Sequence, residues 1–358
     1  MIAFFSFKRV CIRIGIVCFW LFLLTLFLFS PRITRRFRKE KSLNVLTFPE
    51  LIDAEYVYSF QKKTGIKLYI SYYENNDELL VKMHKTKGRE YDIIIPSDYA
   101  IELLVKEGLL KKLDKSKLTF LKNIDERFLH KYFDPQNNYS IPYLWETYKI
   151  GISKNFYKNK SPVASWKLIF DPDHAPKCIV MANNPREAVL LAAFYLFGSI
   201  DNLDDTKIEK IRDLLIKQKK WVEVYTDIRP DCLLASEACP VAVGVSGEIW
   251  QITRFDQDLD FVIPQEGTFM LIDSIALTNY GDKEDLAYQF INYLYTPQVM
   301  GHHAHKYSLF PVTTDVQLDD YFVTSIARIW KEAKKIDFFR NVLSEGQLNS
   351  IWIELKSQ

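Results

Sequence analysis

The chain has 358 residues, of which 48% are hydrophobic and 26% are charged. This composition is typical of a globular protein and excludes a disordered, collagen-like or coiled-coil chain, and the length is sufficient for two domains. Lysine and arginine total 47 against 45 acidic residues, so the formal net charge of +2 gives no indication of a nucleic-acid-binding protein.

The amino terminus is an apolar stretch with basic flanks. Residues 14–31 carry no charge and are mostly Ile, Val, Leu and Phe, and basic residues lie on both sides of them. We therefore expect residues 1–41 to be a secretory signal peptide or an uncleaved membrane anchor. No small-x-small cleavage site is visible, and the stretch is at the lower length limit for a bilayer span. The larger basic cluster follows the stretch, which by the positive-inside rule favours the opposite orientation from an exported body.

The charge of the remaining chain differs in sign from the total. Residues 1–41 hold 9 basic residues and 1 acidic residue, whereas residues 42–358 hold 38 basic and 44 acidic residues. The body therefore carries a net charge of about −6, which gives it a mild attraction for cations.

From Leu43 onward, short apolar or β-branched runs alternate with helical patterns. The continuous apolar run at residues 92–96 is typical of a strand buried on both faces of a parallel sheet. This βαβαβα beginning predicts a doubly wound sheet whose ligand crevice lies at the carboxyl ends of the strands. The predicted elements are strands over 43–48, 67–73 and 92–96, helices over 50–63 and 77–86, and a helix that Ser97 or Asp98 caps and that ends at Gly108.

A second set of similar elements follows Tyr139. No Pro/Gly-rich linker separates the two sets, so we expect two domains joined by several chain crossings. The predicted elements are strands over 139–152, 178–182, 241–245 and 269–277, helices over 186–197 and 207–220, and an amphipathic helical region from Tyr321 to the end.

Three of the five cysteines, Cys178, Cys232 and Cys239, lie in the body, and an odd number argues against a disulfide framework. Cys232 and Cys239 could close a small loop in an oxidising compartment. Half-buried free thiols are the favoured interpretation, because cysteine is commonly a small buried hydrophobic residue.

The segment Gly244–Glu248 comes nearest to a serine-hydrolase motif, but it lacks the last glycine of GxSxG. The favoured interpretation is a strand followed by a helix that Ser246 caps. A membrane-anchored hydrolase with Ser246 as nucleophile is the remote alternative, because no general base with an orienting group is visible. We do not expect an enzyme.

A histidine cluster is formed by His302, His303 and His305. His302 and His305 could share a helix face as metal ligands, but no carboxylate or cysteine nearby in the sequence completes a site. Imidazoles that hold the carbonyls of a solvated helix end are the favoured interpretation. No metal and no cofactor are expected.

Several short segments match one known family in order and at near-constant spacing. They are Lys63–Lys67, Tyr91–Ser97, Lys106–Leu109, Leu113–Leu118, Phe133–Pro135, Tyr139–Tyr143, Ser165–Trp166, Arg186–Glu187, Glu266–Gly267 and Asp273–Ser274. The chain thereby resembles the spermidine/putrescine-binding proteins of bacterial ABC importers. The similarity covers about Leu43 to Pro311 and is denser before Gly151 than after it.

The resemblance implies an α/β fold of the two-lobed periplasmic binding protein type (type II). Each lobe is a mixed sheet flanked by helices, and hinge strands connect the two. On this chain, lobe one would comprise residues 42–146 plus 274–317, and lobe two residues 147–273 plus 318–358. A monomer is expected, because such a receptor must open and close.

In this family, carboxylates pair with the ammonium groups of the ligand, and aromatic rings enclose its methylene chain. A charged acceptor contributes about 1.5–3 kcal/mol, and an aromatic face adds about 0.5–2 kcal/mol. By position, Tyr99 matches a family aromatic residue, Ser97 a polar contact, and Glu187 and Asp273 carboxylates. Arg186 matches an arginine beside the site that orients those acids.

The chain departs from the family at several ligand positions. Phe48 stands where the family has Trp, and Asn184 where it has Asp. The other replacements are Leu51 and Leu309 for Tyr, Gly244 and Leu271 for Trp, and Arg340 for Gln. The site thus keeps two acids and two aromatic residues and loses most of its aromatic walls.

Two additional acids could restore negative charge. Asp98 follows the matched Ser97, and Glu146 takes the place of a small family residue after Trp145. Equally, Asp98 could serve only as a helix cap, and Glu146 could lie outside the cleft.

The resemblance therefore implies a periplasmic receptor, exported or tethered to the inner membrane by residues 14–31. It would capture a polyamine of the spermidine/putrescine class between its lobes and deliver it to an ABC permease and its ATPase. The alternative is the same fold and transport role with another small cationic or zwitterionic ligand, whose carboxylate Arg340 or Arg186 could hold.

Overall fold

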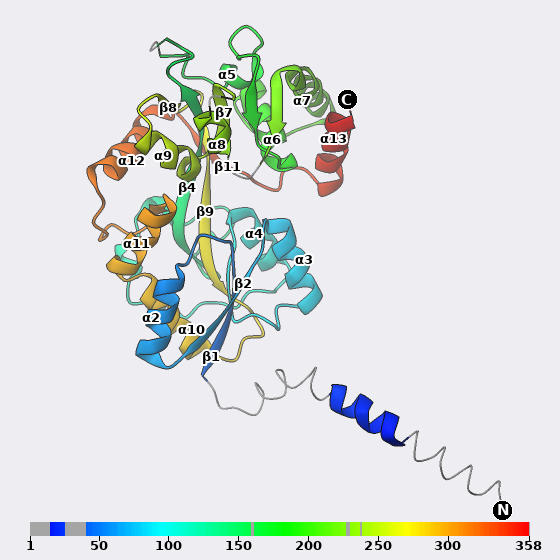
Figure 1. Ribbon diagram of the computed structural model, residues 1–358, viewed down its shortest axis with the longest axis vertical. Helices are drawn as coiled ribbons and strands as arrows, with labels where there is room; N and C mark the ends of the chain where they lie inside the picture. The colour runs from blue at the N-terminus through cyan, green and yellow to red at the C-terminus, as the bar shows by residue number, and fades with distance from the viewer. Residues whose placement is uncertain (1–14, 26–40, 159–160, 227–229, 237, 358) are drawn as a thin grey trace, which may run out of the picture.

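The computed structural model describes residues 15–25, 41–158, 161–226, 230–236 and 238–357. From residue 41 onward the described chain forms two α/β lobes stacked along the long axis of the molecule (Figure 1). Two long strands, β4 and β9, run from one lobe into the other. The predicted α/β class with two lobes is therefore confirmed.

Lobe one, the lower lobe in Figure 1, begins with the predicted βαβαβα series. Strands β2, β1 and β3 lie side by side in that order and are parallel. Strand β3 is central and fully buried, as its continuous apolar run predicts. The strands are β1 (Ser42–Thr47), β2 (Lys67–Tyr72), β3 (Ile93–Ile95) and β10 (Phe310–Pro311); the helices are α2 (Ala54–Thr64), α3 (Asn76–Thr86), α4 (Asp98–Lys106), α10 (Glu284–Leu294) and α11 (Pro297–Tyr307), with 3-10 turns at Lys115–Lys117, Leu121–Asn123 and Glu126–Phe128.

The helix after β1 starts later than the predicted Glu50. Glu50 has a φ of 62°, which is incompatible with a right-handed helix. Helix α2 begins at Ala54, because the side chain of Asp53 accepts a hydrogen bond from the backbone N–H of Glu55 and so caps the helix. It ends at Gly65, whose φ of 72° costs glycine little.

Lobe two, the upper lobe in Figure 1, contains a second sheet with the order β4-β7-β5-β6. Strand β5 pairs in parallel with β6 and β7, and β4 pairs in antiparallel with β7 and β8. The strands are β5 (Ile179–Met181), β6 (Val222–Tyr225), β7 (Val241–Val245), β8 (Leu259–Val262) and β11 (Ile336–Phe338); the helices are α5 (Lys167–Phe170), α6 (Pro185–Phe197), α7 (Asp205–Gln218), α8 (Pro230–Ala235), α9 (Ser246–Phe255), α12 (Asp320–Glu332) and α13 (Glu345–Ser357), with a 3-10 turn at Lys219–Trp221.

The carboxyl-terminal region is not continuously helical, so the prediction for Tyr321 to the end was wrong. Strand β11 separates α12 from α13 and pairs in parallel with the start of β9. Its three residues alternate in burial, and the backbone pairing that fixes them is made with residues far away in the sequence.

The crossing strands β4 (Ser140–Ser153) and β9 (Thr268–Leu277) change partners midway. Residues 140–147 of β4 pair with β9, whereas residues 148–153 pair with β7 and β8 of lobe two. Strand β9 pairs with β11 near its start and with β3 of lobe one near its end. The change of partner at residues 147–148 lies close to a predicted lobe boundary, and the boundaries themselves stay a prediction.

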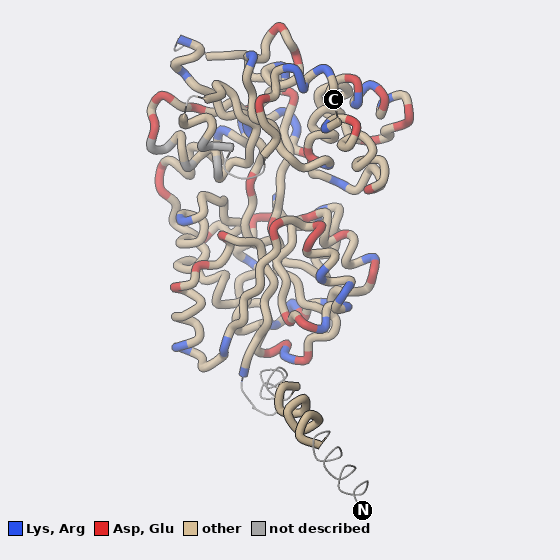
Figure 2. Tube along the Cα trace, turned by 45° about the vertical axis from the view of Figure 1, so that its right-hand side comes forward, with Lys and Arg blue, Asp and Glu red and all other residues tan. Residues whose placement is uncertain are grey.

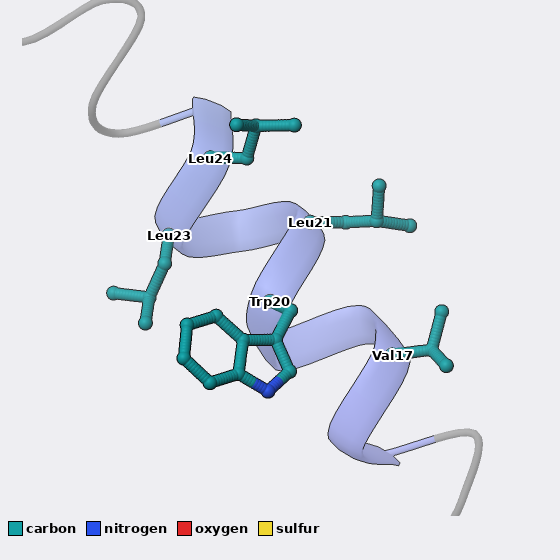
Figure 3. Close-up of a pocket in the computed structure, with 5 residues that line it drawn as sticks. All are labelled: Val17, Trp20, Leu21, Leu23 and Leu24. Carbon is teal, nitrogen blue, oxygen red and sulfur yellow. The ribbon is translucent and has the colours of Figure 1, made fainter.

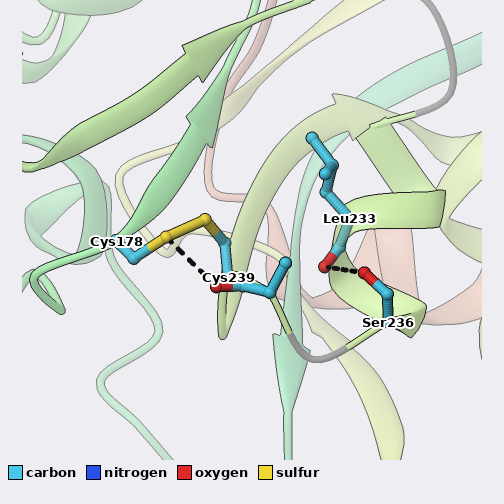
Figure 4. Close-up of a disulfide and its surroundings, with 5 residues drawn as sticks. Cys178, Leu233, Ser236 and Cys239 are labelled. Atoms are coloured by element: carbon cyan, nitrogen blue, oxygen red, sulfur yellow. Dashed lines mark hydrogen bonds between the residues drawn. A yellow bond between two sulfur atoms is a disulfide. The ribbon is translucent and has the colours of Figure 1, made fainter.

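Cys178 and Cys239 form a disulfide (Figure 4), so the interpretation of both as free thiols was wrong. The two residues precede β5 and β7, which are neighbouring parallel strands with Ile179 opposite Val241. This adjacency brings together two cysteines 61 residues apart, a contact that spacing in the sequence does not reveal. The alternative loop between Cys232 and Cys239 is thereby also excluded in this structure.

Residues 15–25, within the predicted signal or anchor segment, are helical and carry exposed apolar side chains on all sides. Val17, Leu21 and Leu24 project on one side, and Trp20 and Leu23 on the other (Figure 3). A helix that is hydrophobic all round is typical of an apolar environment. Among the described helices, none combines the length and apolar character that a membrane crossing requires.

Candidate functional site

Ser97 and Asp273 meet where β3, β9 and the start of α4 come together in lobe one. They form an isolated antiparallel bridge, and the Ser97 hydroxyl donates a 3.0 Å hydrogen bond to Oδ1 of Asp273. The backbone N–H of Ser274 also donates to the carbonyl of Pro96 at 2.9 Å. The structure thus brings together two of the predicted site residues and fixes the position of a carboxylate at the carboxyl end of a parallel strand.

Asp273 is an acid whose charge is poorly solvated. Burial raises its pKa to about 6, although the hydrogen bond from Ser97 acts in the opposite direction. The group is therefore mostly ionised at neutral pH, in a place where water compensates little of its charge. Such a carboxylate gains from a cation that approaches it.

Asp98 lies beside this pair and is fully buried. One carboxylate oxygen accepts a 2.7 Å hydrogen bond from the backbone N–H of Tyr99 in the first turn of α4. Ser97 occupies the N-cap position but makes no side-chain capping bond, because its hydroxyl is engaged with Asp273. Burial raises the pKa of Asp98 well above its usual value, and the charge of Asp273 adds to this shift, whereas the Tyr99 N–H and the Arg186 guanidinium oppose it.

The aromatic residues of the site differ in exposure. Phe48 is 42% exposed and packs edge-on against Tyr73, with ring centroids 5.8 Å apart. Tyr73 is buried and donates its hydroxyl to the carbonyl of Ile95 at 2.6 Å. Sequence reasoning missed Tyr73, whose place directly after β2 could have indicated it. Tyr99 is buried as well, and its ring is covered from lobe two.

The residues of lobe two lie in the first turn of α6. Asn184 is the N-cap, and its side-chain oxygen accepts from the backbone N–H groups of Arg186 at 2.9 Å and Glu187 at 3.3 Å. Asn184, which stands where the family has Asp, can therefore still cap the helix, because both residue types are good N-caps. The side chain of Glu187 is half-buried in the same turn.

Arg186 reaches across to lobe one. Its guanidinium lies 4.6 Å from the centroid of the Tyr99 ring, a cation–π arrangement, and it forms an ion pair with Glu345. It was expected to orient the site acids; the structure adds Glu345, which sequence reasoning missed, as its partner. Nothing near Glu345 in the sequence indicated this contact, because α13 and α6 are far apart along the chain.

A second contact between the lobes lies beside the contact of Arg186 with Tyr99. The side-chain amide of Asn341 donates to Glu102 Oε2 at 2.9 Å and to the carbonyl of Tyr99 at 3.2 Å. Acidic residues gather along the edge of lobe one that faces lobe two (Figure 2). Helix α4 of lobe one is therefore contacted by both Arg186 and Asn341 of lobe two.

The remaining candidate residues lie at the crossing or beyond it. Leu271 and Glu146 stand opposite each other on β9 and β4, both half-buried. Arg340 forms an ion pair with Asp201 at 2.8 Å, so it is engaged within lobe two. Leu51 and Leu309, which replace family tyrosines, are buried core residues.

Ser246 follows β7 at the start of α9, so the predicted strand–helix arrangement is confirmed, but its predicted capping function is wrong. Val245 occupies the N-cap position, and the fully buried hydroxyl of Ser246 accepts a 3.2 Å hydrogen bond from the backbone N–H of Thr147. The hydroxyl therefore joins α9 to β4. It is not accessible as a nucleophile.

The histidines do not cap a solvated helix end, so that interpretation was also wrong. Nε2 of His302 lies 2.6 Å from Asp53 Oδ2, and buried His303 accepts from the backbone N–H of Asp53 at 3.1 Å and contacts the Tyr143 hydroxyl at 2.5 Å. His305 lies 3.8 Å from Asp319. The imidazoles thus connect α11 to other elements. In the described part of the chain, no group of three or more His, Cys, Asp or Glu residues is arranged to hold a metal ion.

Comparisons with known proteins agree with this architecture. Residues 55–328 match the model of the family described as bacterial extracellular solute-binding protein. The spermidine/putrescine-binding periplasmic protein of Escherichia coli K12 is 30% identical over 258 residues, which cover 72% of this chain and 74% of that protein. The putrescine-binding periplasmic protein PotF of the same organism is 30% identical over 281 residues, covering 74% and 76%.

Solved structures show the same two-lobed fold. An ABC transporter protein from Listeria monocytogenes superposes with a TM-score of 0.75 at 27% identity, covering 88% of this chain and 99% of that one. The spermidine/putrescine ABC transporter substrate-binding protein of Streptococcus pneumoniae superposes with a TM-score of 0.74 at 23% identity, with the same coverage, and supports the fold alone. The chain belongs to the bacterial extracellular solute-binding proteins.

Proposed function

We propose that this protein captures a polyamine of the spermidine/putrescine class between its lobes and delivers it to an ABC transporter permease and its ATPase. The observation that carries the proposal is the Asp273 carboxylate, which Ser97 positions and which burial leaves poorly solvated. The names of the curated relatives support this ligand class.

An alkylammonium group needs charged acceptors and an apolar wall. Asp273 lies on the crossing strand β9, and its side chain faces Ser97 of lobe one. Glu187 on α6 of lobe two supplies the second acceptor, and exposed Phe48 supplies a ring for the methylene chain. Each charged acceptor contributes about 1.5–3 kcal/mol. Binding from both lobes favours the closed arrangement over the open one, as a receptor that signals to a permease requires.

The same proposal assigns lesser contributions to the other candidates. Tyr99 is available only when Arg186 moves from its ring, Asn184 acts by capping the turn that carries Glu187, and Glu146 and Leu271 line the crossing strands. We place the lobes at residues 42–146 plus 274–317 and 147–273 plus 318–358. The protein would act as a periplasmic monomer, and residues 14–31 would tether it to the inner membrane if they are not cleaved.

The test is titration calorimetry of the purified full-length chain with putrescine, spermidine and spermine. Asp273→Asn keeps the shape and removes the charge, so we expect amine binding weaker by about 10- to 100-fold. Asp213→Asn, an exposed acid on α7, is the matched control and should leave binding unchanged. Absence of binding heat with all three amines would contradict the polyamine proposal.

A further inference from the structure

The first turn of α4 buries a carboxylate that the fold does not fully satisfy. Asp98 has no exposed surface, and its oxygen Oδ2 has no hydrogen-bond partner in the described part of the chain. Its other oxygen is held by the backbone N–H of Tyr99. A buried, unpartnered carboxylate oxygen is costly when charged, so it favours a proton or a cation beside it.

A second acid lies near this one, because Ser97, the residue directly before Asp98, forms a backbone bridge with Asp273 and donates its neutral hydroxyl to it. The charge of Asp273 also contributes to the raised pKa of Asp98. Two acids that act on each other in a poorly solvated place do not ionise together easily.

The groups that face this pair are mostly acids and phenols. Arg186 is the cation that acts on Asp98, and it already forms an ion pair with Glu345. The other facing groups are Tyr73 after β2, Glu102 and Tyr99 on α4, and Tyr132. The charges of Arg186 and Glu102 offset each other, and burial keeps the phenols neutral, so these neighbours supply no excess of positive charge to the pair.

We propose that Asp98 and Asp273 together bind one ammonium group of the ligand, and that a proton carried by the pair leaves to the solvent when that group arrives. The carboxylic O–H bond breaks, its electron pair stays on the carboxylate, and buffer accepts the proton. This inference rests on the proposed function and adds to it a residue, Asp98, and a proton released on binding.

The consequence is a pH-dependent affinity with a fixed sign. Below the pKa of the pair an amine must displace a proton, so binding weakens as the pH falls; above it the acids are ionised and affinity levels off. Release of one proton corresponds to a change of about tenfold in Kd per pH unit. The ligand amines stay fully charged in acid, so they do not contribute to this dependence.

The experiment is titration of the full-length chain with putrescine or spermidine near the Asp273 pKa of about 6, in two buffers of different ionisation enthalpy. The difference in binding heat gives the number of protons released, and we expect about one per amine bound. A heat that does not depend on the buffer overturns the inference, and this measurement needs no variant.

Variants then assign the proton. Asp98→Asn imitates the protonated side chain, so we expect amine binding to persist with fewer protons released and with a weaker pH dependence. A residue that only capped α4 would leave the proton count unchanged, and that result overturns the assignment. Asp213→Asn should behave as the unmodified protein.

The two proposals fail in different ways. If amines bind without proton release, the inference about Asp98 and Asp273 is contradicted and polyamine capture stands. If no amine binds at any pH, both are contradicted.

Discussion

The hydroxyl of Ser97 influences the charge state of Asp273, the carboxylate on which the proposed ligand capture depends. Its 3.0 Å hydrogen bond stabilises the ionised form of Asp273 against burial. Burial and the charge of Asp273 raise the pKa of the neighbouring Asp98, because like charges favour protonation. At the scale of single residues, affinity for a cation is therefore adjustable without any change in shape.

Ser97→Ala removes this hydrogen bond and leaves the backbone bridge in place. We expect the pKa of Asp273 to rise further and amine binding to weaken by about 5- to 30-fold near pH 6, and by less at pH 8, where the carboxylate ionises in both proteins. The measurement is Kd across this pH range. Ser199→Ala removes a comparable 2.9 Å bond to Asp201 on the surface of lobe two and should change nothing. An equal loss at both pH values would contradict the argument.

At the scale of elements, one buried acid joins two helices of lobe one. Asp53 caps α2 and accepts from Lys306 Nζ at 2.8 Å and from His302 Nε2 at 2.6 Å, both on α11. Burial raises the pKa of Asp53, but these hydrogen bonds lower it more, to well below its usual value. The acid is thus ionised at neutral and at mildly acidic pH.

Asp53→Asn keeps the cap and loses the charge. We expect a loss of about 2–4 kcal/mol in the free energy of unfolding at neutral pH, since breaking one side of a buried ion pair is strongly destabilising. Because the pKa of Asp53 is lower in the folded protein than in the unfolded chain, its charge stabilises the fold fully above the unfolded pKa of about 3.8. This stabilisation is lost as the pH falls from there through the folded pKa. The difference between the two proteins should therefore shrink in acid.

The measurement is denaturant unfolding at several pH values. Asp204→Asn is the matched control, because Asp204 caps α7 in the same way but is exposed and has no comparable ion-pair partner among the residues that the structure describes. It should cost less than about 0.5 kcal/mol. A deficit for Asp53→Asn that persists unchanged into acid would show that charge is not the cause.

The elements also show how far the sequence predicts this fold. The alternation of strands and helices in lobe one follows from local periodicity, and so does burial of β3 on both faces. Periodicity alone did not give the late start of α2, which follows from the positive φ at Glu50 and the cap by Asp53. It also could not give β11, which depends on pairing with β9. The Cys178–Cys239 disulfide could not be predicted from local signals either, because it depends on the pairing of β5 with β7.

The site residues also separate into those that the sequence could predict and those that depend on the tertiary fold. Ser97 and Asp273 could be proposed from the resemblance, and the structure brings them into contact. Arg340 could not be placed, because its partner Asp201 lies in a loop 139 residues away. The contact of Arg186 with Glu345 likewise depends on how α13 packs beside α6.

At the scale of the whole molecule, two short polar contacts connect the lobes beside the site. Arg186 covers the Tyr99 ring, and Asn341 donates to Glu102 and to the Tyr99 carbonyl. Tyr99 and Glu102 lie on α4 of lobe one, and Arg186 and Asn341 lie on lobe two. Strands β4 and β9, in contrast, run continuously through both lobes. Opening the lobes must therefore break these contacts but not the crossing strands.

Asn341→Ala removes two hydrogen bonds that exist only while the lobes are in contact. We expect the closed arrangement to lose about 1–2 kcal/mol, which weakens ligand binding by about 5- to 30-fold and leaves thermal stability of the separate lobes nearly unchanged. Small-angle X-ray scattering of the ligand-free variant should give a larger radius of gyration than that of the unmodified protein. Asn279→Ala is the matched control, since its amide donates at 3.2 Å to the Gly108 carbonyl within lobe one. If both variants bind amines equally well and scatter alike, Asn341 does not hold the lobes together.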